Sequence, residues 1–143
     1  MADITFEGMD DIIRAMDAAG KLDDDTVKDI LNAGADIAVE EIRTQIRGSR
    51  FKIAEYAPYV QKGKIKRNKN GDPYMSVTVS GTNQHGERRG TVLFALNYGR
   101  SSRDPHGEIR PGYFWTVATQ KAKEEAARAM EAALAKKLQK EGL

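Results

Sequence analysis

The chain has 143 residues, of which 40% are hydrophobic and 31% charged, and this length and composition predict one globular domain over residues 1–143. Its apolar runs fall far short of the roughly 20 residues of a membrane span, and no basic-then-apolar segment opens the sequence, so neither a membrane helix nor a signal peptide is predicted. The sequence has no cysteine, which excludes disulfides, thiol catalysis and thiolate metal sites, and it has only two histidines. We therefore expect neither an enzyme nor a bound cofactor.

The net charge of +2 is unevenly distributed along the chain. Residues 1–48 carry five Lys or Arg and twelve Asp or Glu, residues 49–112 carry twelve and five, and residues 113–143 carry six and four. An acidic first third followed by a basic middle predicts faces of opposite sign, which can pair with copies of the same molecule or with a complementary partner. The alternative is that each charged run only solvates its own helix or loop.

The first third of the chain predicts a short strand and two helices. Ile4-Thr5-Phe6 alternates like a strand, and Met9–Ala19 has apolar residues at helical spacing. Asp23-Asp24-Asp25 precede a longer run with apolar steps of three and four residues, so we expect a helix over about 24–47 with the aspartates at its N-terminus. A metal site at these aspartates is the weaker interpretation, because their spacing does not match a Ca²⁺-binding loop.

The middle of the chain predicts hairpins. Residues 49–73 have no periodicity and become strongly basic, and Lys64-Ile65-Lys66 is expected to begin a hairpin arm whose partner starts at Tyr74. Tyr74–Gly81 alternates polar and apolar residues, and Thr91–Tyr98 is continuously apolar, so both are predicted to be strands. The nine residues between them predict a long antiparallel hairpin.

The last part of the chain predicts a loop and a long helix. Gly99–Gly112 is rich in Gly, Ser, Arg, Asp and Pro, and the alanine-rich amphipathic run that follows is expected to be a helix to about Gln139. The order of elements predicts an α+β fold, with a small antiparallel sheet and a long hairpin packed against two or three helices, including the long C-terminal helix.

No group of residues has the pattern of a catalytic, cofactor or metal site. Glu40 and Glu41 point in different directions on the predicted helix. His85 and His106 each stand in a polar loop without a partner at metal-ligand spacing, as solvated side chains do. The glycines within residues 81–90 are not expected to cradle a phosphate, because no helix is predicted directly after them.

A basic segment is the first candidate interaction surface. Its cations are Lys62, Lys64, Lys66, Arg67 and Lys69, with the pair Arg88-Arg89 further along the chain. The aromatic residues near it in the sequence are Tyr56, Tyr59 and Tyr74. Clustered cations bind phosphates and aromatic rings stack on bases, so a nucleic-acid-binding accessory domain that uses the 62–69 hairpin is the alternative function. The structural alternative is a solvated hairpin tip, and no recognised nucleic-acid-binding motif is present.

Two aromatic stretches flank the predicted loop and form the second candidate surface. They are Asn97-Tyr98-Gly99-Arg100-Ser101 and Gly112-Tyr113-Phe114-Trp115. Phe114 is expected in the core where the last helix begins. The candidate protein-interface residues are Tyr98, Arg100, Tyr113 and Trp115, because aromatic and arginine side chains dominate the energetics of protein interfaces.

These two stretches, in this order, resemble the small tail-component (gene-product-ten-like) family of long-tailed phages and prophages. The opening Ile4-Thr5-Phe6-Glu7-Gly8-Met9-Asp10-Asp11-Ile12 is similar to the start of the family, and the helix with Asn32-Ala33-Gly34-Ala35 is similar to its next element. The resemblance spans nearly the whole chain. Many members follow this helix with a Pro…Thr-Gly-x-Leu stretch, which residues 49–64 lack.

The resemblance implies a structural protein that completes the neck, or head–tail junction, and the upper tail during virion assembly, without catalytic turnover. It implies several copies around the portal–tail axis, in a homo-oligomeric ring that contacts neighbouring neck and tail proteins. The expected location is the bacterial host cytoplasm during assembly and the virion afterwards, with no membrane contact. The 62–69 segment is then expected to face the DNA channel or an acidic neighbour.

Overall fold

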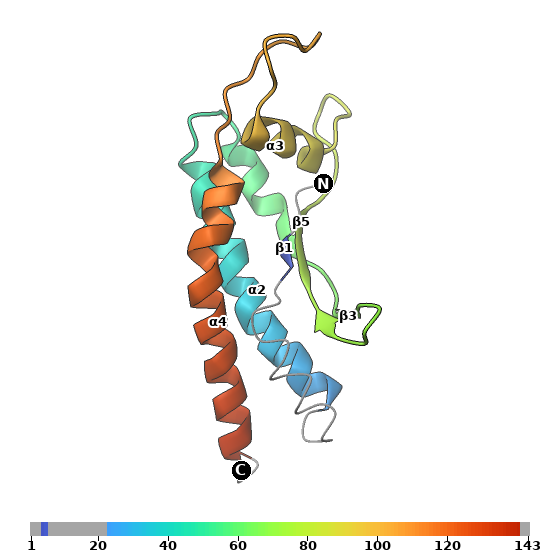
Figure 1. Cartoon of the computed structure of the whole chain (residues 1–143), viewed down its shortest axis with the longest axis vertical. Coiled ribbons are helices and arrows are strands. Elements are labelled where there is room, and N and C mark those ends of the chain that lie inside the picture. Colours follow the sequence, from blue (N-terminus) through green and yellow to red (C-terminus); the bar gives the residue numbers. More distant parts are fainter. Residues whose placement is uncertain (1–3, 6–22, 141–143) are drawn as a thin grey trace.

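The computed structural model describes residues 4–5 and 23–140 of the chain. Two long helices, α2 (Asp24–Arg47) and α4 (Phe114–Lys140), lie side by side and run in opposite directions along the molecule (Figure 1). The helices predicted at about 24–47 and in the C-terminal part of the chain are therefore confirmed. The helix predicted at Met9–Ala19 lies outside the described residues.

Small side chains allow α2 and α4 to pack closely. The buried stripe of α4 consists of Ala118, Ala122, Ala126, Met130 and Leu134. On α2, a Cβ atom added at Gly34 would lie 2.6 Å from the Met130 sulfur, so the glycine leaves the space that the methionine fills. This packing places apolar surface of both helices away from water, which is the main source of helix stability in a folded protein.

The N-terminus of α2 is capped as the sequence predicted. The backbone N–H of Thr26 donates to Oδ1 of Asp23 at 2.8 Å, and hydrogen bonding by Thr26 lowers the pKa of the Asp23 carboxyl below its usual value. Asp24 forms an ion pair with Arg67 at 3.0 Å. Asp23-Asp24-Asp25 therefore serve the start of the helix, and the capping interpretation is confirmed.

The sheet is antiparallel and its central strand is β5 (Ser76–Val79). β5 pairs with β1 (Ile4–Thr5) on one side and with β2 (Val60–Lys62) on the other. Further along the same hairpin, β3 (Lys66–Arg67) pairs with β4 (Pro73–Tyr74), with Lys66 opposite Tyr74. The predicted hairpin arm at Lys64-Ile65-Lys66 with a partner at Tyr74 is thus confirmed.

One face of the sheet covers α2. Met75, Val77 and Val79 alternate inward and are buried, whereas Ser76 and Thr78 are partly exposed. The α+β class, the small antiparallel sheet and the long C-terminal helix predicted from the sequence are confirmed.

An arginine of α2 bonds to the free edge of β2. A 3₁₀ helix, η1 (Ala54–Tyr59), leads into β2. The carbonyl of Tyr59 and the N–H of Gly63 bond to β5, so by alternation the carbonyl of Val60 faces away from the sheet. Arg43 donates to that carbonyl at 2.8 Å and to the carbonyl of Ala57 at 3.1 Å. The arginine therefore ties the edge strand and the 3₁₀ helix to α2.

The strand predicted at Thr91–Tyr98, and its hairpin with Tyr74–Gly81, are wrong, because these residues form a helix, α3 (Arg89–Tyr98). Leu93 and Asn97, one helical turn apart, point into the protein and are buried. Phe94 and Tyr98, each the next residue along the helix, lie on a solvent-exposed side and are 44% and 52% exposed. An exposed face made of aromatic residues gives a continuously apolar sequence, which removes the helical period from the pattern.

Candidate functional site

Asn97 joins the end of α3 to the start of α4. Its buried side-chain oxygen accepts hydrogen bonds from the backbone N–H groups of Trp115 and Thr116 at 2.9 and 3.2 Å, and its amide donates to the Thr116 hydroxyl at 3.0 Å. The first N–H groups of a helix have no partner within the helix, so Asn97 satisfies donors of α4 from a distant position in the chain. The sequence near Asn97 carries no signal for this role, because its partners lie 18 and 19 residues further along the chain.

The segment between α3 and α4 is a projecting loop, as predicted (Figure 1). Its ends are held together by two backbone hydrogen bonds between Arg100 and Ile109, and the Arg100 guanidinium donates to the carbonyl of His106 at 3.2 Å. Arg50 donates to the carbonyls of Arg110 and Pro111. Arg100, predicted as an interface residue, therefore orders its own loop.

Gly99 is required at the start of this loop. Its φ is +78°, and a Cβ atom there would lie 2.5 Å from the carbonyl oxygen of Ile109. Both the backbone conformation and the close approach exclude a larger residue without a local rearrangement. The sequence signal for this turn, an aromatic residue followed by Gly, was recognised, although it ends a helix and not a strand.

Phe94 and Tyr98 form an exposed aromatic pair on α3. The ring centroids are 4.7 Å apart and the rings are tilted by 52°. Tyr113 lies next to the end of α3, because its backbone N–H donates to the carbonyl of Asn97 at 3.1 Å, and its side chain is 51% exposed. Its φ of +52° is unusual for a residue with a side chain and costs about 1–3 kcal/mol. Tyr98 and Tyr113 thus remain accessible, as an interface residue must be.

The other two aromatic residues of the second stretch are buried. Phe114 lies in the core, as predicted, and packs edge-on against Phe51 with centroids 6.3 Å apart. Trp115, predicted as an interface candidate, is also in the core and is only 4% exposed. Trp115, at the start of α4, is therefore not accessible to a partner, which contradicts its choice as an interface candidate.

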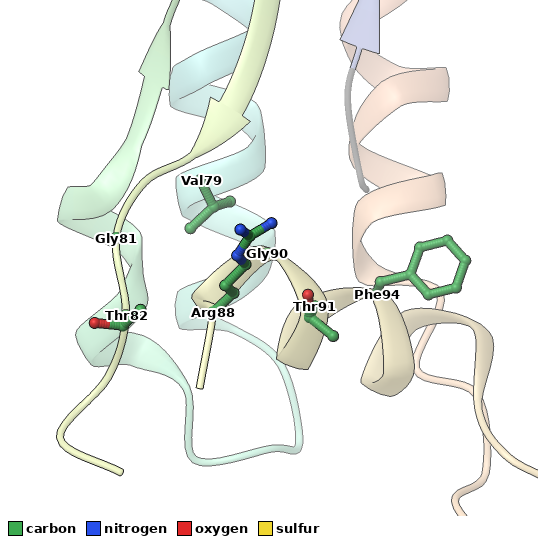
Figure 2. A pocket seen from close by; sticks show the side chains of 7 residues that line it. All are labelled: Val79, Gly81, Thr82, Arg88, Gly90, Thr91 and Phe94. Atoms are coloured by element: carbon green, nitrogen blue, oxygen red, sulfur yellow. The ribbon is translucent and has the colours of Figure 1, made fainter. Parts of the chain in front are cut away.

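A groove of about 460 Å³ lies between the end of β5 and the first turns of α3, beside the aromatic pair. It is lined by Val79, Gly81, Thr82, Arg88, Gly90, Thr91 and Phe94. Figure 2 shows the side chains of Val79 and Arg88 lying toward each other, with the ring of Phe94 further along α3. The groove therefore combines apolar walls with one guanidinium.

The groove also contains the N-terminus of α3. No side chain caps this helix, and Arg88 at the cap position is exposed, so both the helix dipole and the arginine favour a negative charge nearby. Arg89 is engaged elsewhere: its guanidinium lies 3.4 Å from the centroid of the Tyr59 ring and donates to the carbonyl of Ser80. The prediction that no helix follows the glycines of 81–90 was wrong, since α3 begins at Arg89.

The basic residues of the 62–69 hairpin divide into two groups. Lys62 forms an ion pair with Asp36 at 2.6 Å, and Arg67 forms one with Asp24 at 3.0 Å. The lysines at positions 64, 66 and 69 are exposed and belong to none of the ion pairs between described residues. The aromatic candidates for base stacking are also separated, because Tyr56 is buried and Tyr59 lies under Arg89.

Within residues 4–5 and 23–140, no group of three or more His, Cys, Asp or Glu side chains could hold a metal ion. His85 and His106 are exposed in their loops. Glu40 pairs with Arg43, and Glu41 accepts from Gln45, so the two glutamates have separate partners. None of the helices in the described part of the chain is long and apolar enough to cross a membrane.

No protein-family model, curated protein or solved structure matches the chain.

Proposed function

We propose that the chain is a structural protein of the phage or prophage head–tail junction, which acts by protein–protein assembly in multiple copies and catalyses no reaction. The observation that carries the proposal is the aromatic pair of Phe94 and Tyr98 beside the groove. Large exposed aromatic side chains next to an apolar hollow are typical of protein-interaction surfaces. The resemblance of the sequence to phage tail components supports a place in the virion, with assembly in the host cytoplasm.

The occupant of this surface, in our proposal, is the acidic N-terminal part of α2 of a second copy. Asp25 and Asp29 are exposed one turn apart in α2. Figure 1 shows that the start of α2 and α3 lie at opposite ends of the molecule. Carboxylates of one copy thus complement the arginine and helix N-terminus in the groove of the next.

A contact between two different surfaces has a geometric consequence. Each copy retains one free groove and one free acidic end, so the contact repeats until a ring closes or a filament grows. A closed ring around an axis is the arrangement that a head–tail junction requires. The remaining exposed surfaces of the ring are then available to neighbouring neck and tail proteins.

The first experiment measures molar mass by light scattering over a range of protein and salt concentrations. We expect the mass of the unmodified chain to rise with concentration and to fall with salt, because the contact joins opposite charges. The double substitution Phe94→Ser with Tyr98→Ser is expected to leave a monomer. The matched control, Ala132→Ser with Ala135→Ser, changes two exposed positions of α4 and should associate like the unmodified chain.

The second experiment tests the place in the virion. In the phage or prophage that encodes the chain, deletion of its gene should leave heads and tails unjoined in electron micrographs, and the unmodified gene supplied in trans should restore joined particles. Infectious particles in normal yield from the deletion would refute the head–tail role. Normal yield from the Phe94 and Tyr98 double variant would refute the aromatic pair as the assembly surface.

A further inference from the structure

We infer that residues 62–74, which include the β3–β4 hairpin and are here called the arm, bind the phosphate backbone of nucleic acid. The binding residues are Lys64, Lys66 and Lys69. This inference goes beyond the proposed assembly role and does not depend on it. It begins from the division of the basic residues into those that hold the arm and those that the arm presents to solvent.

Two cations fix the arm to α2. Lys62 at the base of the hairpin pairs with Asp36, and Arg67 in β3 pairs with Asp24 at the first residue of the helix. These contacts neutralise acidic residues of α2 with basic residues of the hairpin. Some of the opposite charges of the two segments are therefore paired within one molecule. Lys64, Lys66 and Lys69 remain exposed.

The tip of the arm is ordered by its own hydrogen bonds. The side-chain oxygen of Asn68 accepts from the backbone N–H groups of Asn70 and Asp72 at 2.9 and 3.0 Å, and Arg67 donates to the carbonyl of Gly71 at 2.9 Å. The backbone N–H of Asn68 donates to the carbonyl of Asp72 at 3.0 Å. A preformed tip loses little conformational entropy when it binds, so a few charged contacts suffice for measurable affinity.

The arm presents charge of one sign. Asp72 is the only carboxylate among residues 62–74, and it is buried. The Cα atoms of Lys64, Lys66 and Lys69 span at most about 18 Å of extended chain. Duplex DNA carries about one negative charge per 1.7 Å of its axis, so all three ammonium groups can reach phosphates of one short stretch of duplex.

The composition of the arm favours nucleic acid over an acidic protein as its partner. Lysine is depleted in protein–protein interfaces, where buried aromatic and apolar anchors supply most of the energy. Ile65, the aliphatic residue of the arm, packs against the core and offers no such anchor. Tyr74, which lies opposite Lys66 and is partly exposed, carries a hydroxyl of the kind that contacts phosphate oxygens.

The test is fluorescence anisotropy of a labelled 30-base-pair DNA of mixed sequence, titrated with the full chain at several salt concentrations between 30 and 200 mM. We expect binding that weakens steeply with salt. The triple variant Lys64→Gln, Lys66→Gln, Lys69→Gln should bind at least tenfold more weakly at the lowest salt. Its slope of log affinity against log salt should be shallower by about 2.7, which corresponds to three phosphate contacts.

A matched control separates the arm from net charge. The triple variant Lys121→Gln, Lys123→Gln, Lys136→Gln removes the same three charges from exposed positions of α4 and should bind DNA within about threefold of the unmodified chain. Circular dichroism and light scattering check that both variants keep the fold and the mass of the unmodified chain.

Three outcomes would overturn the inference. The first is no binding by the unmodified chain at 30 mM salt, and the second is an equal loss of affinity in the two triple variants. The third is displacement of the DNA by polyglutamate as effectively as by unlabelled DNA at equal charge, because this would identify an acidic protein surface as the partner.

Discussion

The side chain of Asn97 is bonded to residues in another helix. It belongs to α3, yet its side chain bonds to two N–H groups and one hydroxyl of α4. Removing it leaves buried donors without an acceptor, which costs more than the loss of an exposed hydrogen bond.

We therefore predict that Asn97→Ala lowers the free energy of unfolding by about 1–3 kcal/mol, measured by urea denaturation. Thr116→Val is the comparison, because it removes the hydroxyl that Asn97 contacts but leaves both backbone bonds in place. It should cost less than Asn97→Ala. Equal losses in the two variants would contradict a capping role for Asn97.

Individual residues were predicted well where their partners are close in sequence. Asp23 accepts a hydrogen bond from the backbone N–H of Thr26, three residues away, so local spacing was sufficient to predict the cap. The capping role of Asn97 and the burial of Trp115 were not predicted. Both depend on how α3 packs against α4, which local spacing does not show.

At the scale of elements, the contact between α2 and α4 depends on the space that Gly34 leaves. A Cβ atom at this position would meet the sulfur and Cγ of Met130 at 2.6 and 2.8 Å. Alanine is the better helix former by up to about 1 kcal/mol, but insertion of a methyl group into a packed interface typically costs about 1–3 kcal/mol.

We therefore predict that the effect of Gly34→Ala on stability depends on the side chain at position 130. In the unmodified chain the substitution should destabilise the fold by about 1–2 kcal/mol. In a Met130→Ala background, where the space is open, the same substitution should be neutral or stabilising by up to about 1 kcal/mol. Thermal or urea unfolding of the four proteins measures the coupling. Additive effects would mean that Gly34 and Met130 do not compete for one volume.

The elements that were predicted correctly have one exposed polar face. α2 and α4 alternate buried apolar and exposed charged positions, and β5 alternates Val with Ser and Thr, so their periods are visible in the sequence. α3 was missed because Phe94 and Tyr98 make its solvent face apolar. Its start was also not visible, since Arg88 and Arg89 stand where a capping side chain would be expected.

At the scale of the whole molecule, the charges at its two ends predict how copies associate. If Arg88 of one copy lies near Asp25 and Asp29 of the next, then Arg88→Glu alone, or Asp25→Lys with Asp29→Lys alone, should reduce self-association through like-charge repulsion. A mixture of the two variants should associate again, because every contact in an alternating assembly then joins opposite charges. The masses of the two variants and of their mixture, measured by light scattering, test this arrangement.

The mass of the mixture tests whether these groups are in direct contact. Recovery of mass only on mixing indicates a direct contact between these groups. Failure of the mixture to recover, with both variants folded by circular dichroism, would refute the pairing of the groove with α2.

Arg43 bonds to a backbone carbonyl at the edge of the sheet, where a strand of another molecule could add. Unpaired carbonyls on an edge strand are templates on which further strands add, and such growth leads to fibrils. The Arg43 guanidinium bonds to the outward carbonyl of Val60, so this acceptor of the β2 edge already has a partner within the molecule. Where many copies lie close together, this contact removes one of the acceptors on which a strand of another copy would pair.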